Sequence, residues 1–373
     1  MSADSSLTYS LMSSLSLYSH NVPKNNNNNN ELLNRQYNTS KKRSIWSEGL
    51  ERNIDTIVLG KYDNSKPHQK LVAEMKRLGK TLGFNVAESD VKESGWIEDI
   101  GIRRADGKVY VLPRMGNCSD IKTGQDVEFN SAVSLNFAKK FNQRKIIKGK
   151  SYLEGGNVLN TILKNGEAGA VIGTASIDYS LRAMHLKDTP QNRSIVKAQI
   201  AKDLGLKLKN VSFIQQYDFH IDMFYRPLKN GEIAVPDYLE AIKVLKNTKI
   251  SGMDAHSKFL LMKQLKKAHD RNAVSIRNAE RELTKSGYKL VKIPCFSLPT
   301  NMCDNTGINY ANGVCGKDKN GKLYIITNKS NYKELDAQII KYYKKAGVNN
   351  VYFVSTQQYL KSNGGLDCRT QEF

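Results

Sequence analysis

The sequence has little of what defines several large protein classes. No stretch of about twenty residues is continuously apolar, so there is no candidate transmembrane helix. Proline (8 of 373 residues) and glycine (26) are too scarce for a collagenous or wholly disordered protein. The five cysteines are odd in number and contain no Cys-x-x-Cys pair, which argues against a disulfide framework and a zinc site. These absences favour a globular protein of a reducing compartment, and we expect a cytoplasmic location.

Acidic residues are also few relative to basic ones. The chain has 36 Asp and Glu against 57 Lys and Arg, a formal net charge of +21. Such an excess suits a binder of nucleic acid, anionic membrane or acidic protein, and equally a lysine-rich solvated surface. The densest basic stretch, 243–292, is interpreted as containing a long, mostly exposed helix without any zinc-finger, RRM or basic-zipper pattern. The charge is therefore compatible with an acidic macromolecular partner but does not require one.

The first 47 residues differ in composition from the rest. They contain a serine-rich opening, six consecutive asparagines at 25–30 and a basic cluster at 41–43. Such polar tracts cannot bury enough apolar surface to offset chain entropy, so a disordered tail is predicted at 1–47. The segment 7–18 is a poor signal peptide, because no Lys or Arg precedes it and serines interrupt it. Secretion or delivery into another cell through the tail remains an alternative to the cytoplasm.

From residue 48 to 373 the apolar residues follow alternating strand and helix patterns. Short apolar runs predict strands at 56–59, 84–86 and 109–112, and helical spacing from Leu71 to Leu78 predicts a helix between the first two. Further strands are predicted at 170–172, 211–216, 220–225, 290–293, 323–327 and 351–354, and further helices at 127–141, 194–204, 258–286 and 332–346. The interleaving favours a single α/β domain of repeated strand–helix units.

Two polar segments stand out in the first half of this domain. Residues 95–101 set Glu98 and Asp99 between glycines before a strand, and the plainer interpretation is a polar turn. Residues 153–159 contain Glu154 followed by Gly155 and Gly156. That pattern suits a carboxylate at a strand end where the backbone must approach a ligand closely, or a simple strand-to-turn junction.

A third segment, 217–224, contains His220 and Asp222. On a predicted strand these two side chains project to the same side, with Asp218 alongside. The apolar residues that alternate with them would face the core: Phe219, Ile221 and Met223. Charged groups in an apolar strand cost several kcal/mol, on the order of 2–7, unless they are paired or serve a ligand. A structural His–Asp pair and a functional pair both fit.

The fourth segment places Cys368 after Gly364 and Gly365, near the end of the sequence. Such a cysteine is either incidental or held by tertiary contacts as a nucleophile. With His220 it suggests a thiol protease, but a neutral amide gains nothing from several nearby carboxylates. A planar guanidinium, by contrast, presents paired N–H donors that two carboxylates can grip bidentately. A cationic guanidino substrate is therefore favoured.

The four segments in order (Trp-x-x-Asp, Glu-Gly-Gly-Asn, His-Ile-Asp and Gly-Gly-x-x-Cys) resemble the guanidine-modifying, or penteine, superfamily. The layout is most similar to agmatine deiminase, and more distantly to arginine deiminase and bacterial peptidylarginine deiminase. Residues 309–313 (Asn-Tyr-Ala-Asn-Gly) resemble a further motif of that family. The resemblance runs from about residue 55 to the C-terminus. It implies a five-bladed pseudo-symmetric α/β propeller, which we expect over 48–373.

The resemblance also implies roles for particular residues. Cys368 would attack the guanidinium carbon, His220 would act as general acid and then base, and Glu154 would orient His220 or contact the substrate. The implied catalytic residues are Cys368, His220, Glu154, Asp222 and Asp99. The implied substrate-binding residues are Asp99, Asp222, Glu154, Trp96 and Asn157. No metal and no cofactor are expected, because Cys368 and His220 lack further soft ligands nearby.

The sequence departs from the family pattern at three positions: Glu98 in place of arginine, Ile102 in place of proline and Asp367 in place of histidine. The implied reaction is hydrolysis of a guanidinium to a ureido group and ammonia through a covalent cysteine thiouronium. Agmatine is the first choice of substrate, and an arginine side chain in an acidic protein is the second. The alternatives are an amidinotransferase that uses the same cysteine and a catalytically inactive basic binding protein. The oligomeric state stays open.

Overall fold

The structure is a computed structural model that describes residues 47–61, 65–89, 96–100, 102–111, 134–137, 139, 146–302, 307–361 and 364–372. The chain divides into two units, Met1–Arg43 and Ser44–Phe373, and every described residue belongs to the second. The tail predicted at 1–47 lies outside the described residues except for Ser47. The helix predicted at 127–141 lies largely outside them as well, although 134–137 are helical.

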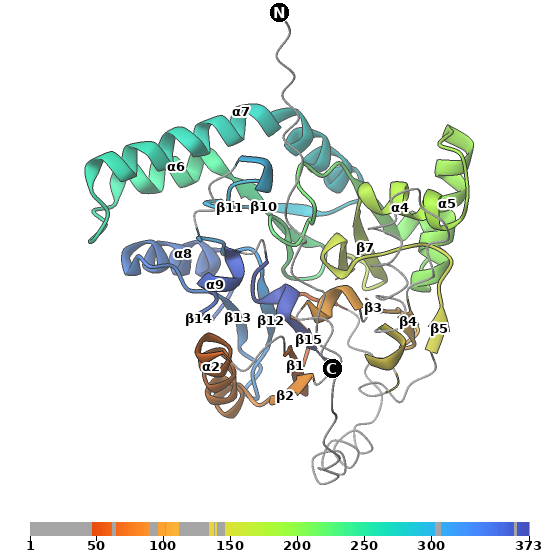
Figure 1. Cartoon of the computed structure of the whole chain (residues 1–373), viewed down its shortest axis with the longest axis horizontal. Helices are drawn as coiled ribbons and strands as arrows, with labels where there is room; N and C mark the ends of the chain where they lie inside the picture. Colours follow the sequence, from red (N-terminus) through yellow and green to blue (C-terminus); the bar gives the residue numbers. More distant parts are fainter. Residues whose placement is uncertain are drawn as a thin grey trace, which may run out of the picture. The chain divides into compact units, whose positions relative to one another are not determined.

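The described residues form five three-stranded sheets (Figure 1). The first sheet has the strand order β15 (Thr370–Glu372), β1 (Thr56–Gly60), β2 (Asn85–Ser89), and the second has β3 (Ile102–Arg103), β4 (Val109–Val111), β5 (Ile146–Lys148). The third has β6 (Val158–Ile162), β7 (Ala168–Gly173), β8 (Val211–Ile214), and the fourth has β9 (Arg226–Pro227), β10 (Glu232–Asp237), β11 (Lys289–Pro294). The fifth has β12 (Gly313–Lys317), β13 (Leu323–Asn328), β14 (Asn350–Val354). In every sheet the central strand pairs antiparallel with the strand before it in this order and parallel with the strand after it. The predicted α/β class is confirmed.

One of these sheets joins the two ends of the described chain. Strand β15 pairs antiparallel with β1, so that Ile57 lies opposite Glu372 and Leu59 lies opposite Thr370. Strand β2 pairs parallel with β1 on the other side. A sheet therefore anchors the segment that carries Cys368, as expected for a cysteine held by tertiary contacts.

The parallel pairs need crossover connections, and helices supply most of them. Helix α2 (Lys66–Leu82) connects β1 to β2, and α8 (Lys333–Lys345) connects β13 to β14. Two helices connect the parallel strands of two other sheets: α4 (Ala175–Ala183) with α5 (Pro190–Leu204), and α6 (Tyr238–Asn247) with α7 (Ala255–Lys285). No helix in the described ranges combines the length and hydropathy needed to cross a bilayer.

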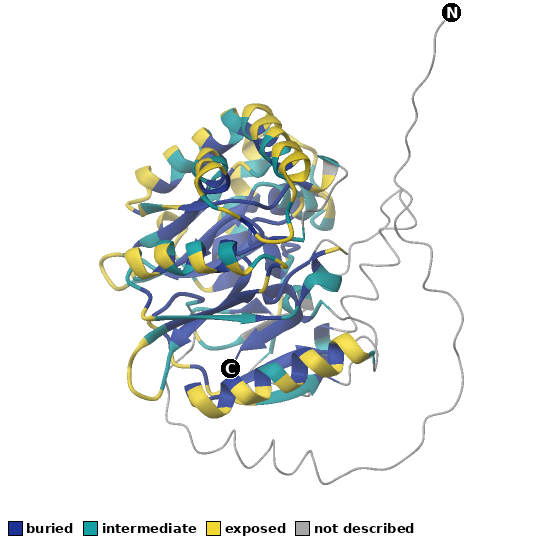
Figure 2. Cartoon of the chain, turned by 90° about the vertical axis from the view of Figure 1, so that its left-hand side faces the viewer, coloured by how far each residue is buried: buried dark blue, intermediate teal, exposed yellow. Residues whose placement is uncertain are grey.

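Helix α2 shows how the local sequence sets these elements. The Ser65 hydroxyl accepts a hydrogen bond from the backbone N–H of His68, and Gly83 ends the helix at φ 97°. The predicted apolar stripe is buried, including Leu71, Met75 and Leu78. Figure 2 shows the same division, with helices exposed on one side and strands dark blue inside the molecule.

The strand predicted at 220–225 is wrong. The backbone N–H groups of Ile221 and Asp222 both donate to the carbonyl of Gly156 at 3.0 Å, and Tyr225 N–H donates to Ile221 at 2.9 Å. These bonds fold the segment into a turn, and only the short strand β9, beginning at Arg226, follows it. His220 and Asp222 therefore do not share a strand face.

Candidate active site

Five polar segments occupy the same topological position, directly before the first strand of each sheet. Asp99 lies in the 3-10 turn η1 (Ile97–Ile100) before β3, and Glu154 precedes η2 (Gly155–Asn157) before β6. The turn with Asp222 precedes β9, Asn312 precedes β12, and Cys368 lies in η5 (Asp367–Arg369) before β15. Turns η1, η2 and η5 contact one another. The repeated sheet topology thus brings together residues that are far apart in the sequence.

His220 forms one half of the site with two carboxylates. Its Nε2 lies 3.1 Å from Glu154 Oε2 and 3.9 Å from Asp99 Oδ1. Asp99 is itself fixed, because Oδ1 accepts a hydrogen bond from Gly156 N–H at 3.2 Å. Burial alone would lower the pKa of His220, but the charge of Asp99 and the hydrogen bond to Glu154 outweigh it and raise that pKa to about 10. His220 is therefore a cation at neutral pH.

Cys368 forms the other half. Its thiol donates to Asp222 Oδ2 at 3.1 Å, and the Asn312 amide donates to the same oxygen at 2.6 Å and to the sulfur at 3.3 Å. Asp222 is fully buried, and its Oδ1 has no hydrogen-bond partner among the described residues. A buried, unpaired carboxylate oxygen beside a thiol is an acceptor available to a cationic ligand.

Burial and negative neighbours govern the protonation of this half. Burial raises the pKa of Asp222 to about 6, although the positive charge of His220 works against the rise. Burial, followed by the charges of Asp222 and Glu98, holds the pKa of the Cys368 thiol well above its usual range. Without a ligand, Cys368 is therefore a thiol at neutral pH. A cation among these carboxylates would favour the thiolate.

The two glycines after Glu154 make room for the site itself. A Cβ on Gly156 would collide with the His220 ring, and a Cβ on Gly155 would collide with the backbone carbonyl of Glu98. The glycines therefore admit the His220 ring and the Glu98 backbone at close range, and their approach to a ligand stays a prediction.

Trp96 and Asn157, the two further residues expected to bind substrate, lie beside the site. A Cβ on Gly364 would collide with the Trp96 ring, so Trp96 packs against the turn that carries Cys368. The Asn157 side chain is fully buried and donates to the carbonyl of Phe219 at 2.9 Å. That bond holds the loop from which His220 projects. Substrate contact by either residue stays a prediction.

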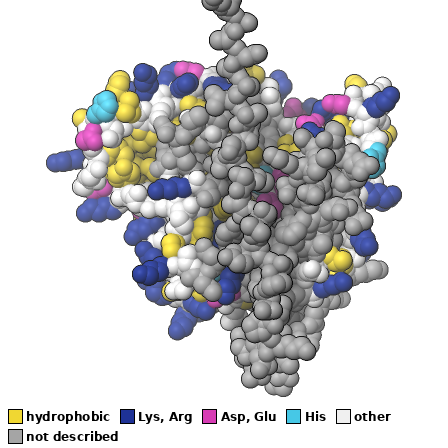
Figure 3. Space-filling view, in the orientation of Figure 1, with side chains coloured by type: hydrophobic (Ala, Val, Ile, Leu, Met, Phe, Trp, Pro, Cys, Tyr) yellow, Lys and Arg dark blue, Asp and Glu magenta, His cyan; other side chains and the backbone are white. Residues whose placement is uncertain are grey.

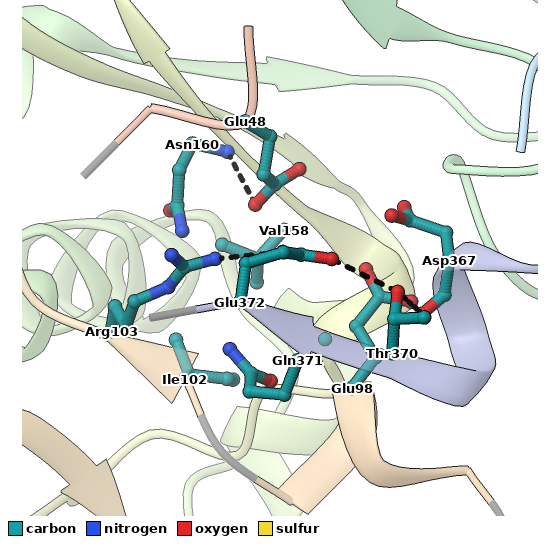
Figure 4. Close-up of a pocket in the computed structure, with 11 residues that line it drawn as sticks. Glu48, Glu98, Ile102, Arg103, Val158, Asn160, Asp367, Thr370, Gln371 and Glu372 are labelled. Atoms are coloured by element: carbon teal, nitrogen blue, oxygen red, sulfur yellow. Dashed lines mark hydrogen bonds and ion pairs between the residues drawn. The ribbon is translucent and has the colours of Figure 1, made fainter. Parts of the chain in front are cut away.

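A second group of charged residues, which we call the inner cluster, adjoins the site. The cluster consists of Glu48, Arg52, Arg103, Arg226, Asp367 and Glu372. Four of its members, Glu48, Arg103, Asp367 and Glu372, line a small buried pocket (Figure 4). Glu372 lies 3.2 Å from Arg52 and 3.3 Å from Arg103, while Arg226 pairs with Asp367 and lies 3.9 Å from Glu48. Burial tends to raise the pKa of Glu372, but Arg52 and Arg103 hold it below its usual value.

Glu98 lies between the inner cluster and the site, and the sequence prediction missed it as a site residue. Its carboxylate lies within 4.8 Å of ligand atoms of both Asp222 and Cys368, and within the same distance of Glu48 and Asp367. Burial, followed by the charge of Asp367, raises its pKa well above the usual value. In the sequence, position 98 stands out only as a departure from the family pattern. Its adjacency to Asp99 was the available signal.

Among the residues that the structure describes, two triads of side chains have ligand atoms close enough to reach one metal ion: Glu98, Asp222 and Cys368, and Glu48, Glu98 and Asp367. Arg226 already supplies positive charge to Glu48 and Asp367, so a cation in the second triad would compete with it. The first triad contains the expected nucleophile, and a metal there would occupy its sulfur. The expectation that no metal is needed stays a prediction.

Two further expectations are corrected. Asp218 does not join the site, because its carboxylate accepts hydrogen bonds from the backbone N–H of Thr300 at 3.1 Å and from the Thr300 hydroxyl. Phe219 does not face the core; it is 37% exposed, and its ring centroid lies 4.6 Å from that of His220. Both errors follow from the turn at this segment, which removes the period-two alternation of a strand.

The fold is shared with solved enzyme structures. C. jejuni agmatine deiminase superposes with a TM-score of 0.53 at 18% identity, over 87% of this chain and 95% of that one. A Cys-to-Ser variant of that enzyme with substrate bound gives 0.53 at 16%, over 87% and 95%. Agmatine deiminase of Enterococcus faecalis gives 0.53 at 13%, over 87% and 94%. The chain therefore has the α/β fold of structures in the guanidine-modifying superfamily.

No family model matches the sequence, and no curated protein matches it.

Proposed function

We propose that this protein is a deiminase that hydrolyses a guanidinium group to a ureido group and ammonia, with Cys368 as the nucleophile. The observation that carries the proposal is the composition of the site. A thiol 3.1 Å from Asp222 and a histidine 3.1 Å from Glu154 and 3.9 Å from Asp99 contact three carboxylates in all. His220 is the one cationic side chain in that set, so a guanidinium would supply the missing positive charge.

Substrate binding would engage Asp99 and Asp222, which lie in different halves of the site. The unpaired Oδ1 of Asp222 is a ready acceptor for one guanidinium N–H group. The bound cation would offset the carboxylates that raise the pKa of Cys368, and the thiol would lose its proton. The nucleophile would then be activated only when substrate is present.

The chemistry would follow in two halves. The Cys368 thiolate adds to the guanidinium carbon, and protonated His220 donates its proton to the departing ammonia, which leaves a covalent thiouronium. The now neutral His220 takes a proton from water, whose oxygen attacks the same carbon. The C–S bond then breaks, the proton of the new hydroxyl group passes to the leaving sulfur, and the ureido product and the Cys368 thiol are released. Glu154, hydrogen-bonded to His220, would orient the ring in both halves.

The five sheets are proposed to be the blades of one propeller domain over 48–373. The shared strand pattern and the pairing of β15 with β1, which joins the ends of the described chain, support this arrangement. In such a propeller the segments before each first strand would surround a central polar channel. The inner cluster would line that channel behind the site.

Agmatine is the preferred substrate. Free arginine would need a cationic group to receive its α-carboxylate, and Arg369, next to Cys368, is the nearest candidate in sequence. Arg369 is buried, donates to the carbonyl of Gly60 at 2.6 Å and stacks 4.4 Å from the Tyr359 ring centroid. It is thus engaged elsewhere. The solved structures described above are agmatine deiminases by name, while two others that share the fold are named as putative peptidyl-arginine and arginine deiminases.

The test is ammonia release from agmatine, free arginine and an arginine-containing acidic protein, measured side by side at physiological salt. Release from agmatine alone supports the first choice, and release from the protein alone replaces agmatine with protein arginine. Transfer of the amidino group to an added amine, without ureido product, indicates an amidinotransferase. No reaction with any substrate favours a catalytically inactive binding protein and overturns the proposal.

A further inference from the structure

The helix pair α6 and α7 has an apolar surface that neither the core nor the site uses. The two helices lie side by side (Figure 1). One stripe of each helix packs into the protein; on α7 it includes Leu261, Leu265 and Ala268. Helical spacing of three and four residues explains why these side chains share a face. The predicted exposed helix at 258–286 is thus half buried along its length.

A second stripe on each helix lines a groove between them. Its floor contains Leu239 and Ile242 of α6 with Phe259 and Met262 of α7, again at a spacing of three residues. Phe259 is 57% exposed and Leu239 is 48% exposed. The groove has a volume of about 1410 Å³, more than the roughly 300–1,000 Å³ of a typical small-molecule pocket. Its size suits a peptide or protein segment.

The rim of the groove has one acidic side chain, Asp270, and six basic ones: Lys243, Lys246, Lys263, Lys266, Lys267 and Arg271. Figure 3 shows apolar side chains gathered over this end of the molecule with Lys and Arg beside them.

Two rim cations already have partners, since Lys243 pairs with Glu240 and Lys266 pairs with Asp270. The others have no acidic side chain within ion-pair distance in the described part of the chain: Lys246, Lys263, Lys267 and Arg271. An apolar floor beside four uncompensated cations favours a ligand that is apolar along one stripe and acidic on both sides.

We propose that the α6–α7 groove binds an acidic amphipathic helix of a partner protein. Such a helix presents apolar residues at i, i+3, i+4 and i+7, which match the floor, and acidic residues on either side, which match the rim. None of the groove residues belongs to the catalytic or binding set. The proposal is therefore independent of the proposed deimination.

Charge and shape disfavour the other occupants. A second copy of this chain would add a net charge of +21 to a basic groove. Residues 1–46 contain five Lys and Arg against two Asp and Glu, so this segment is not acidic either. The phosphates of a nucleic acid would pair with the basic rim, but they would make no favourable contact with the apolar floor. A bilayer would favour apolar side chains that protrude from a surface over ones that line a groove.

The test is fluorescence anisotropy of a labelled synthetic helix, with Leu and Phe on one face and Glu flanking it, titrated with the full-length protein. Two peptides serve as controls: one of the same composition with the apolar face scrambled, and one with Lys in place of every Glu. Vesicles that contain phosphatidylserine, an anionic lipid of the cytoplasmic leaflet, test binding to a membrane. Sedimentation of the protein alone tests binding to a second copy.

Matched variants locate the binding. Phe259→Glu should weaken binding of the acidic helix about tenfold or more, and Lys263→Glu with Lys267→Glu about as much. Val274→Glu, on the same helix but outside the groove and 60% exposed, should change it less than about twofold. Each variant should keep the wild-type circular dichroism spectrum, because every replaced side chain is exposed.

The expected result is preferential binding of the acidic helix that weakens with added salt and with the groove variants alone. Equal binding of the scrambled or Lys-flanked peptide overturns the proposal, as does the absence of binding. Vesicle binding or self-association that is lost in Phe259→Glu, without peptide binding, assigns the groove to a membrane or a second copy instead.

Discussion

Two regions rich in charge lie next to each other in this protein, and they differ in how far their negative charges are balanced by positive ones. In the inner cluster three carboxylates (Glu48, Asp367 and Glu372) face three arginines (Arg52, Arg103 and Arg226). In the site three carboxylates (Asp99, Glu154 and Asp222) face one cation, His220. The formal charges of the inner cluster balance, and burial raises the pKa of Glu48 to about 8, so the cluster has no excess of negative charge, which suits a structural role. The site leaves negative charge over, which suits a cationic ligand.

The largest expected effect tests the site. Cys368→Ala should lower turnover by about 10³-fold or more, because Cys368 is the one thiol among the described residues of the site. The measurement is ammonia release, with thermal unfolding as the check on folding.

Cys295→Ala is the matched control for that variant. Burial raises the pKa of Cys295 to about 12, so this thiol stays protonated and should be inert. Turnover near the wild-type rate in Cys368→Ala, or an equal loss in Cys295→Ala, would contradict the assignment.

The next effect tests the inner cluster. Arg226→Met should lower the free energy of unfolding by about 3–5 kcal/mol, because it leaves buried Asp367 and Glu48 without their cation. Asp222→Asn should leave stability nearly unchanged or increased, since it removes excess negative charge, while turnover falls steeply. Urea denaturation of both variants measures the contrast. Equal loss of stability in the two would show that the site is charge-balanced as well.

The pH profile sharpens the comparison further. Activity should fall as pH drops through about 6, where Asp222 gains a proton, and as pH rises through about 10, where His220 loses one. Glu154→Gln removes a hydrogen bond and a charge that raise the His220 pKa. The alkaline limb of kcat/KM should therefore move to lower pH by roughly one unit, with the acid limb in place. A shift of the acid limb alone would contradict the assignment of Glu154 as the residue that raises the pKa of His220.

The smallest effect belongs to Glu98, which joins the two regions. Burial raises the pKa of Glu98 well above its usual value, which favours the neutral carboxyl form, and glutamine matches that form in shape and charge. Glu98→Gln should change kcat/KM less than about threefold at that pH. A loss above tenfold would mean that the Glu98 charge itself takes part in binding or catalysis.

The sequence predicted much of the fold because apolar periodicity is a local signal. The stripe of α2 and the runs at β1, β7 and β14 are apolar enough to stand out, and they lie where expected. The segment 220–225 failed because two polar residues at alternate positions also fit a turn. Its backbone bonds to Gly156, which decide between the two, join residues far apart in the sequence.

The site residues also divide into those with a local sequence signal and those whose role depends on contacts between distant segments. Residue type and motif order predicted five site residues: Cys368, His220, Asp222, Glu154 and Asp99. The structure pairs Cys368 with Asp222, and His220 with Glu154 and Asp99, while their roles stay predictions. Asn312 and Glu98 were missed as site residues because their importance depends on contacts across the fold. The inner cluster was not foreseen at all, since its charges come from strands and turns of different sheets.

The most direct test of the central claim is to trap the covalent state. Full-length protein would be mixed with agmatine, quenched in acid within the first turnovers and analysed by intact and peptide mass spectrometry. The account predicts a mass gain equal to the substrate less one ammonia, located on the peptide containing Cys368 and absent from Cys368→Ala. Ammonia release that proceeds without this adduct, and survives in Cys368→Ala, would contradict it.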